Sequence, residues 1–238
     1  MNILSIGNSF SQDAQAYVKG VFEAAGVEAL AANLYIGGCT LVRHWNNAAS
    51  DIADYELEIN GQSVGRNISI REALDMCDWD VITLQESSAR SVEIGHFTPY
   101  LPKLAEYIRA RCKKAKIALM QTWGYNDEKL HVIKNLGFST PEAMFDASEK
   151  CYAEAKEMIG ADLIIPAGKA IKNLYMAQAH SHRDGQHASL GLGRYTLALT
   201  WLKALCGIEA TGNSFRDFSE ELTDEQIKLA WESADNAF

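Results

Sequence analysis

The sequence has no excess of basic charge and no long apolar run. Its 238 residues include 22 lysines and arginines against 31 aspartates and glutamates, a formal net charge of −9. Nucleic acids and anionic membranes bind clustered Lys and Arg, so the composition argues against both as partners. No apolar run approaches the roughly 18 residues that would indicate a membrane span.

Cysteine and proline are scarce. The five cysteines are odd in number, scattered and without C-x-x-C spacing, which favours reduced thiols in a cytoplasmic protein over a disulfide framework. The four prolines and the lack of a Ser/Gly/Pro-rich linker favour one domain over residues 1–238. The N-terminus lacks a basic stretch before an apolar one, so we interpret it as a strand and not as a signal peptide, although a chain trimmed of its leader would look the same.

Short apolar runs alternate with segments of helical period. Continuous runs are typical of parallel strands covered on both faces. We expect five such strands, at Ile3–Ile6, Leu30–Ile36, Val81–Gln85, Ile117–Gln121 and Leu163–Ile165. The alternation predicts an α/β protein, a three-layer α/β/α sandwich around a mainly parallel five-stranded sheet. An insertion at about 54–70 breaks this rhythm, and its Asn60-Gly61 pair predicts a small β-hairpin with a type I′ turn.

The first predicted strand ends in Gly7-Asn8-Ser9-Phe10-Ser11, and a helix follows at once. Ligands of open parallel sheets bind outside the carboxyl ends of the strands. Ser9 would lie near a helix N-terminus, where backbone N–H groups stabilise negative charge on a nearby oxygen. The alternative is that Ser9 only caps the helix, because Ser9 and Gln12 have the spacing of a capping box.

A second polar cluster holds three histidines and an aspartate within eight residues. Asp184 and His187 are three apart, so on a helical turn the carboxylate can fix the tautomer of the imidazole and leave its other nitrogen free as a base. A rival interpretation is a zinc site formed by His180, His182, Asp184 and His187, in a spacing close to the H-x-H-x-D-H signature of metal-dependent hydrolases. That spacing is off by one, and no second ligand cluster follows.

Two other predicted strand ends carry candidate groups. Gly37 and Gly38 follow the second strand, where the lack of a side chain lets a backbone N–H approach a ligand. Gln85 and Glu86 end the third strand, where a carboxamide could donate a hydrogen bond to an oxyanion. In isolation, a Gly-Gly pair is usually just a turn, and the segment with Gln85 and Glu86 is equally well explained as an ordinary loop.

Together these pieces resemble the SGNH/GDSL-type hydrolases, whose sequence blocks are named for Ser, Gly, Asn and His. Gly7-Asn8-Ser9 is similar to the Gly-Asp-Ser block, Gly38 or its neighbour Gly37 to the glycine block, and Asp184-Gly185-Gln186-His187 to the Asp-x-x-His block. The third block, Gly-x-Asn-Asp, is absent, and Gln85 occupies its place. The chain looks similar to a divergent, less characterised bacterial branch of the family.

The resemblance implies an SGNH hydrolase fold, which is flavodoxin-like, and a serine esterase that uses no cofactor and no metal. Ser9 would attack an acyl carbonyl, His187 would take its proton and Asp184 would stabilise the imidazolium. The N–H groups of Ser9 and Gly38, with the Gln85 amide, would bind the oxyanion. The implied substrate is a short acyl ester, such as an acetyl ester, of a carbohydrate or small-molecule alcohol. An acyltransferase or thioesterase with the same triad and a non-catalytic ligand-binding domain are the alternatives.

Four residues are candidates for contact with the substrate. Trp123 follows the fourth strand at the same sheet edge, where an indole could stack on a sugar ring, against the usual core packing of tryptophan. His44 follows the Gly-Gly turn, and His182 lies close to His187 in the sequence. Glu86 would disfavour anionic substrates if its carboxylate points toward the nucleophile.

Overall fold

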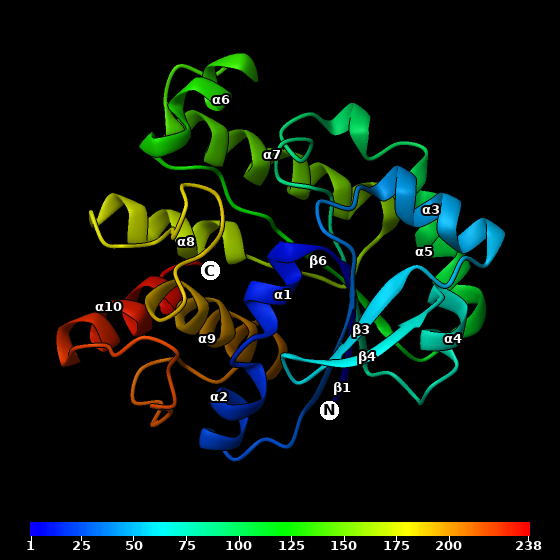
Figure 1. Ribbon diagram of the computed structural model, residues 1–238, viewed down its shortest axis with the longest axis horizontal. Coiled ribbons are helices and arrows are strands. Elements are labelled where there is room, and N and C mark those ends of the chain that lie inside the picture. The colour runs from blue at the N-terminus through cyan, green and yellow to red at the C-terminus, as the bar shows by residue number, and fades with distance from the viewer.

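The computed structural model describes residues 1–238, and one seven-stranded sheet runs through its centre (Figure 1). The strands are β1 (Asn2–Gly7), β2 (Leu30–Tyr35), β3 (Tyr55–Ile59), β4 (Gln62–Ile68), β5 (Val81–Leu84), β6 (Lys116–Met120) and β7 (Leu163–Ile165), in the order β4-β3-β2-β1-β5-β6-β7. Strands β2, β1, β5, β6 and β7 are parallel to one another. They are the five strands predicted from the apolar runs.

The hairpin belongs to this sheet, which corrects the expected number of strands from five to seven. Strand β3 pairs antiparallel with β2, and β4 pairs antiparallel with β3. Asn60 and Gly61 connect them with φ angles of 51° and 76°, the two positive values that a type I′ turn requires. The physical reason for the correction is that β2 would otherwise be an open edge with unpaired N–H and C=O groups.

Helices cover both faces of the sheet, as the three-layer prediction requires (Figure 1). One face carries α1 (Ser9–Gln15), α2 (Val18–Ala24), α8 (Ala167–Met176), α9 (Leu192–Cys206) and α10 (Asp224–Asp235). The other carries α3 (Leu41–Ser50), α4 (Ile70–Leu74) and α5 (Tyr100–Arg111), while α7 (Pro141–Ile159) contributes to both layers. The remaining elements are two short 3₁₀ helices, η1 (Ile94–His96) and η2 (Asp127–Lys129), and the short helix α6 (Leu130–Asn135).

The two hydrophobic layers explain why the strands are continuously apolar. Side chains alternate between the faces of a strand, and in β1 Ile3 lies in one layer while Leu4 and Ile6 lie in the other. All three are fully buried. Each parallel strand therefore carries apolar residues on both faces, and polar side chains buried within the strands are hydrogen-bonded, as Ser5 is to Thr83.

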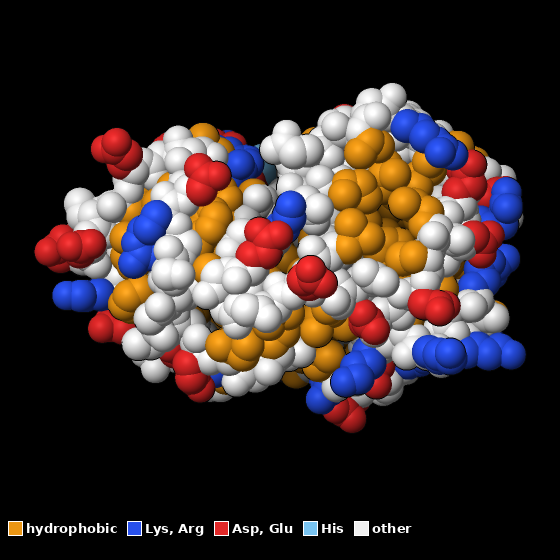
Figure 2. Space-filling view, turned by 90° about the horizontal axis from the view of Figure 1, so that it is seen from below, with side chains coloured by type: hydrophobic (Ala, Val, Ile, Leu, Met, Phe, Trp, Pro, Cys, Tyr) orange, Lys and Arg blue, Asp and Glu red, His pale blue; other side chains and the backbone are white.

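The face of the molecule drawn in Figure 2 has mixed charge. Figure 2 shows Lys and Arg interspersed with Asp and Glu on the face seen from below Figure 1, without a continuous basic patch. This agrees with the acidic composition. None of the helices combines the length and the apolar character that crossing a membrane would need.

Candidate active site

The turn from β1 into α1 places Ser9 at the first position of the helix. Asn8 is the residue that caps it, because Asn8 Oδ1 accepts the Phe10 N–H at 3.0 Å and the Asn8 N–H donates to Ser11 Oγ at 3.0 Å. The capping box considered for Ser9 and Gln12 is therefore not formed. The half-buried Ser9 hydroxyl is left available for another partner.

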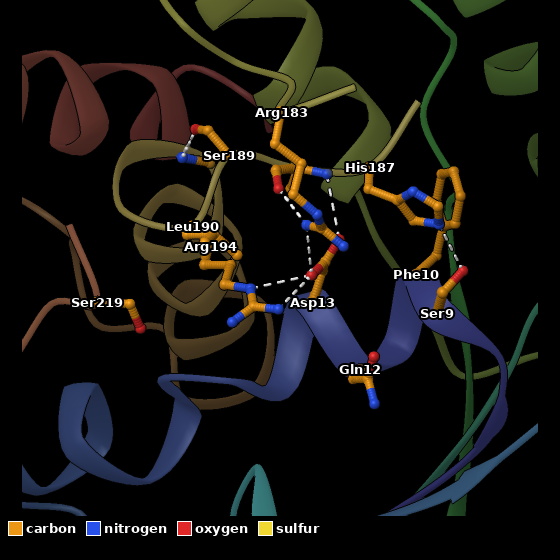
Figure 3. Close-up of polar contacts among 12 residues, drawn as sticks. Ser9, Phe10, Gln12, Asp13, Arg183, His187, Ser189, Leu190, Arg194 and Ser219 are labelled. Atoms are coloured by element: carbon orange, nitrogen blue, oxygen red, sulfur yellow. Dashed lines mark hydrogen bonds and ion pairs between the residues drawn. The ribbon is translucent and has the colours of Figure 1, made fainter. Parts of the chain in front are cut away.

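That partner is His187, 178 residues later in the chain. Ser9 Oγ lies 2.9 Å from His187 Nε2 (Figure 3). On the other side of the ring, His187 Nδ1 lies 2.7 Å from Asp184 Oδ2. A neutral imidazole carries one N–H, and a carboxylate only accepts, so the proton is on Nδ1 and Nε2 accepts from the serine. The structure thus brings together Ser9, His187 and Asp184 in the order that a serine nucleophile, its base and an orienting acid require.

The Asp184 carboxylate is held by its own loop. Its Oδ1 accepts the backbone N–H groups of Gln186 at 3.0 Å and His187 at 2.7 Å. Partial burial raises the pKa of this carboxyl, but hydrogen bonds from the N–H and ring of His187 and from Gln186 outweigh it and lower the pKa to about 2. Asp184 is consequently ionised at any pH where an imidazole can act as a base.

Two backbone N–H groups, one after β1 and one after β2, have no acceptor within the chain. The first N–H groups of a helix have no intrahelical partner, and Ser9 is the first residue of α1. Gly38 lies in a turn closed by the Cys39 N–H bonding to Ile36 O at 3.1 Å. Its φ of +62° favours glycine, it is exposed, and its N–H donates no hydrogen bond.

Gln85 is buried beside them. Its Nε2 donates to Asn8 Oδ1 at 2.8 Å, while its Oε1 has no partner. Because Asn8 Oδ1 must also accept the Phe10 N–H, it can only face the NH₂ end of Gln85. A primary amide has two N–H bonds, so Gln85 retains one donor beyond the bond to Asn8.

Glu86 and Trp123 are buried behind the site, and neither is on its surface. Glu86 Oε1 accepts the N–H groups of Leu41 at 3.2 Å and Ser87 at 2.7 Å. It thereby ties the chain just after the Gly-Gly turn to the end of β5, and burial raises its pKa. The Trp123 ring packs 4.1 Å from the Phe10 ring, and its Nε1 donates to the backbone next to His187.

The structure places His44 and His182 in the interior. His44 Nδ1 lies 2.9 Å from Tyr55 Oη, and His182 contacts Gly124 O through Nε2 at 3.0 Å and Ser181 Oγ through Nδ1 at 2.8 Å. Burial lowers the pKa of His44 to about 3 and that of His182 to about 4. Neutral, enclosed imidazoles of this kind make internal contacts, and they do not line the surface around Ser9.

The four residues of the zinc interpretation do not converge. Both ring nitrogens of His182 are engaged within the fold, and Asp184 is bound to His187. No three His, Cys, Asp or Glu side chains of the chain lie together as metal ligands would. The donor set therefore does not fit a metal centre.

Asn8 is a structural residue that the sequence did not identify. Its Nδ2 donates to Cys39 O at 2.9 Å, and its Oδ1 accepts from Gln85. It joins the ends of β1, β2 and β5 next to Ser9. A carboxylate could replace the accepting oxygen, but its second oxygen would face the Cys39 carbonyl.

Asn8→Asp is therefore expected to lower the free energy of unfolding by about 1–3 kcal/mol at neutral pH. A protonated carboxyl can still donate to Cys39 O, so the folded variant should keep this side chain protonated, with its pKa raised. In the unfolded chain the same carboxyl releases its proton above about pH 4. The loss of stability should grow as pH rises from 4 to 7. Urea denaturation at both values measures it, with the exposed Asn46→Asp as the matched control. A pH-independent loss would contradict this account.

Comparison with known proteins identifies a family and structures of the same fold. Residues 2–237 match a family described as Domain of unknown function (DUF4886). The crystal structure of a DUF4886 family protein from Bacteroides uniformis ATCC 8492 is 33% identical, with a TM-score of 0.93 over 100% of this chain and 94% of that one. The search of curated proteins found no match.

Two more distant structures have the same architecture. A member of the lipolytic protein G-D-S-L family from Veillonella parvula DSM 2008 is 13% identical, with a TM-score of 0.55 over 87% of this chain and 100% of that one. A variant of Axe2, an acetyl xylan esterase from Geobacillus stearothermophilus, is 14% identical, with a TM-score of 0.53 over 85% and 93%. At these identities the likeness concerns the fold, and it confirms the SGNH/GDSL resemblance at that level.

Proposed function

Because the chain belongs to the DUF4886 family and has the fold of the SGNH hydrolases, we propose that it is a serine esterase. The observation that carries the proposal is the continuous hydrogen-bonded chain from Ser9 through His187 to Asp184. These side chains come from opposite ends of the sequence, and a merely structural serine would not need an imidazole held in one tautomer by a carboxylate. The functional test is the replacement of Ser9 by alanine, which should remove nearly all turnover of p-nitrophenyl acetate.

In the proposed reaction, Ser9 Oγ attacks the acyl carbonyl while His187 Nε2 accepts its proton. The ionised Asp184 stabilises the imidazolium, which then gives the proton to the leaving alcohol. Water, activated by the same imidazole, hydrolyses the acyl-serine and restores the free hydroxyl. The unpaired N–H groups of Ser9 and Gly38 are the proposed donors to the oxyanion of both tetrahedral intermediates.

Gln85 is proposed as a third oxyanion donor, through the amide hydrogen that Asn8 does not use. Gln85→Ala is then expected to lower kcat by about 10²–10³-fold with little change in KM, because the donor acts mainly in the transition state. Steady-state kinetics on p-nitrophenyl acetate test this. Gln85→Met, which keeps the volume and lacks the donor, should behave like alanine. If kcat stays at the wild-type value in both variants, the two backbone donors suffice and Gln85 has no such role.

A short acyl group is the proposed substrate moiety. Three aromatic side chains that follow the carboxyl ends of β1 and β6, Phe10, Trp123 and Tyr125, are at most 4% exposed, so they form no open apolar groove for a long chain. The acetyl xylan esterase of similar fold supports an acetylated carbohydrate as the alcohol component. Turnover of p-nitrophenyl esters should fall as the acyl chain lengthens. Acetylated sugars, thioesters and added alcohol acceptors separate the esterase from a thioesterase or acyltransferase.

A further inference from the structure

Asp13 is a buried carboxylate one helical turn beyond Ser9 on α1. Residues four apart lie on the same side of a helix, so α1 presents Asp13 and Ser9 to the same segment, the loop between α8 and α9. The Asp13 side chain is 0% exposed. Carboxylates are rarely buried unless they are paired, and the proposed reaction gives this one no chemical role.

Two arginines and a backbone N–H surround the Asp13 carboxylate (Figure 3). Arg183 Nη1 donates to both oxygens, each at 2.9 Å. Arg194, on α9, donates to Oδ1 through Nε at 2.9 Å and lies 2.8 Å away through Nη2. The Ala188 N–H donates to Oδ2 at 3.1 Å.

Two of these partners flank the acid and the base. Arg183 directly precedes Asp184, and Ala188 directly follows His187. The flanks are also joined to each other, because the Arg183 N–H donates to His187 O at 3.0 Å and Arg183 Nη1 donates to Ala188 O. Asp184 and His187 thus lie in a closed turn, and Asp13 is hydrogen-bonded to the residues at both ends of that turn.

The other hydrogen bonds to this turn come from the loop after β6. Trp123 Nε1 donates to Gln186 O at 2.9 Å, and the Asn126 N–H donates to Gly185 O at 3.0 Å. Neither of these two donors lies on α1. Apart from the bond between Ser9 and His187 and the contact between the Phe10 and His187 rings, whose centroids lie 5.9 Å apart, the Asp13 cluster is what ties the turn to the helix that carries the nucleophile.

We propose that Asp13 is a positioning residue that fixes the turn of Asp184 and His187 against α1 and so sets the approach of His187 Nε2 to Ser9 Oγ. This inference rests on the proposed esterase function for its kinetic readout. A displacement of about 1 Å between reacting groups can cost about 10²-fold in rate without affecting substrate binding. The predicted signature is therefore a loss in kcat that leaves KM nearly unchanged.

Asp13→Asn tests the proposal. The amide keeps one accepting oxygen, but its NH₂ group must face an arginine or the Ala188 N–H, which are donors themselves. We expect kcat for p-nitrophenyl acetate to fall about 10²-fold in the folded protein. Arg183→Lys keeps the charge but has a single ammonium for Asp13 and Ala188 O, so it should give a smaller loss of the same kind and serves where Asp13→Asn does not fold.

Asp235→Asn is the matched control for a purely structural role. Asp235 is also a poorly exposed aspartate that accepts two backbone N–H groups, those of Ala210 at 2.8 Å and Thr211 at 3.1 Å, and pairs with Lys203. It lies at the end of α10. Asp235→Asn should lower the melting temperature and leave kcat unchanged. If Asp13→Asn also lowers only the melting temperature, the proposal is overturned.

A second measurement does not depend on activity. The His187 Nδ1 proton, which is hydrogen-bonded to Asp184, should give a far-downfield proton NMR signal, and His187 gives ring-proton signals as well. Asp13→Asn should shift or broaden these signals, whereas Asp235→Asn should not. If the wild type has no esterase activity, the proposed function fails while this comparison still decides on Asp13. Signals identical in Asp13→Asn and wild type would refute the positioning role.

Discussion

Replacing Ser9 by alanine is expected to lower kcat for p-nitrophenyl acetate by about 10⁶-fold, close to the loss of all triad catalysis. The Ser9 hydroxyl is 2.9 Å from the base, and alanine has no atom that can attack the carbonyl or deliver a proton. The fold should be retained, because Asn8 caps α1 and the hydroxyl makes no other hydrogen bond. Steady-state kinetics, with a melting curve of the variant, measure both.

Labelling identifies the nucleophile independently of turnover. An alkyl fluorophosphonate should react stoichiometrically with the wild type and abolish its activity, and it should leave Ser9→Ala unlabelled. Ser63→Ala, which removes an exposed hydroxyl from the hairpin, is the matched control and should be labelled like the wild type. Equal labelling of wild type and Ser9→Ala would exclude the serine mechanism. Activity lost with a chelator and restored by zinc would favour the metal-dependent alternative.

The parallel part of the fold could be predicted because a strand buried on both faces has a local sequence pattern, a continuous apolar run. The hairpin has a different pattern. Tyr55–Ile59 alternates, which indicates one polar face, and nothing local says what that face contacts. In the structure Glu58 on this face is buried, where it accepts hydrogen bonds from Asn33 at 2.8 Å and from Gln12 on α1. From the sequence alone, a polar strand face that packs against a helix cannot be distinguished from one that faces solvent.

Some residues of the candidate site could be predicted from the sequence and others could not, for a related reason. Ser9, Asp184 and His187 stand in short motifs similar to blocks of the SGNH/GDSL-type hydrolases, so they could be selected from the sequence, and the structure brings their side chains together. His44 is buried against the Tyr55 hydroxyl and His182 against the Gly124 carbonyl, and neither contact can be read from the sequence around the histidine, which indicated a substrate-facing ring. Asp13 left a readable signal, an acid four residues after the nucleophile, but its arginine partners are 170 and 181 residues away. Only the folded chain shows that they meet.

Asp184→Asn is expected to lower kcat by about 10⁴-fold while the geometry is preserved. The two backbone N–H groups at Asp184 Oδ1, from Gln186 and His187, can only donate, so the asparagine oxygen must take that place. Its NH₂ group then stands where Oδ2 was and points at His187 Nδ1. Nδ1 has to accept, the ring proton moves to Nε2, and the imidazole faces Ser9 as a donor that cannot take the serine's proton.

If Asp184→Asn acts only by changing the tautomer of His187, substrate binding and stability should not change. KM and the melting temperature should stay close to the wild-type values, because the loop keeps its backbone hydrogen bonds, and Asp146→Asn, exposed on α7, should leave kcat unchanged. Nitrogen-15 NMR of the imidazole should find the proton on Nδ1 in the wild type and on Nε2 in Asp184→Asn. A variant that retains kcat within about tenfold, with the proton still on Nδ1, would mean that His187 takes its orientation from elsewhere and that Asp184 is not the acid of a triad.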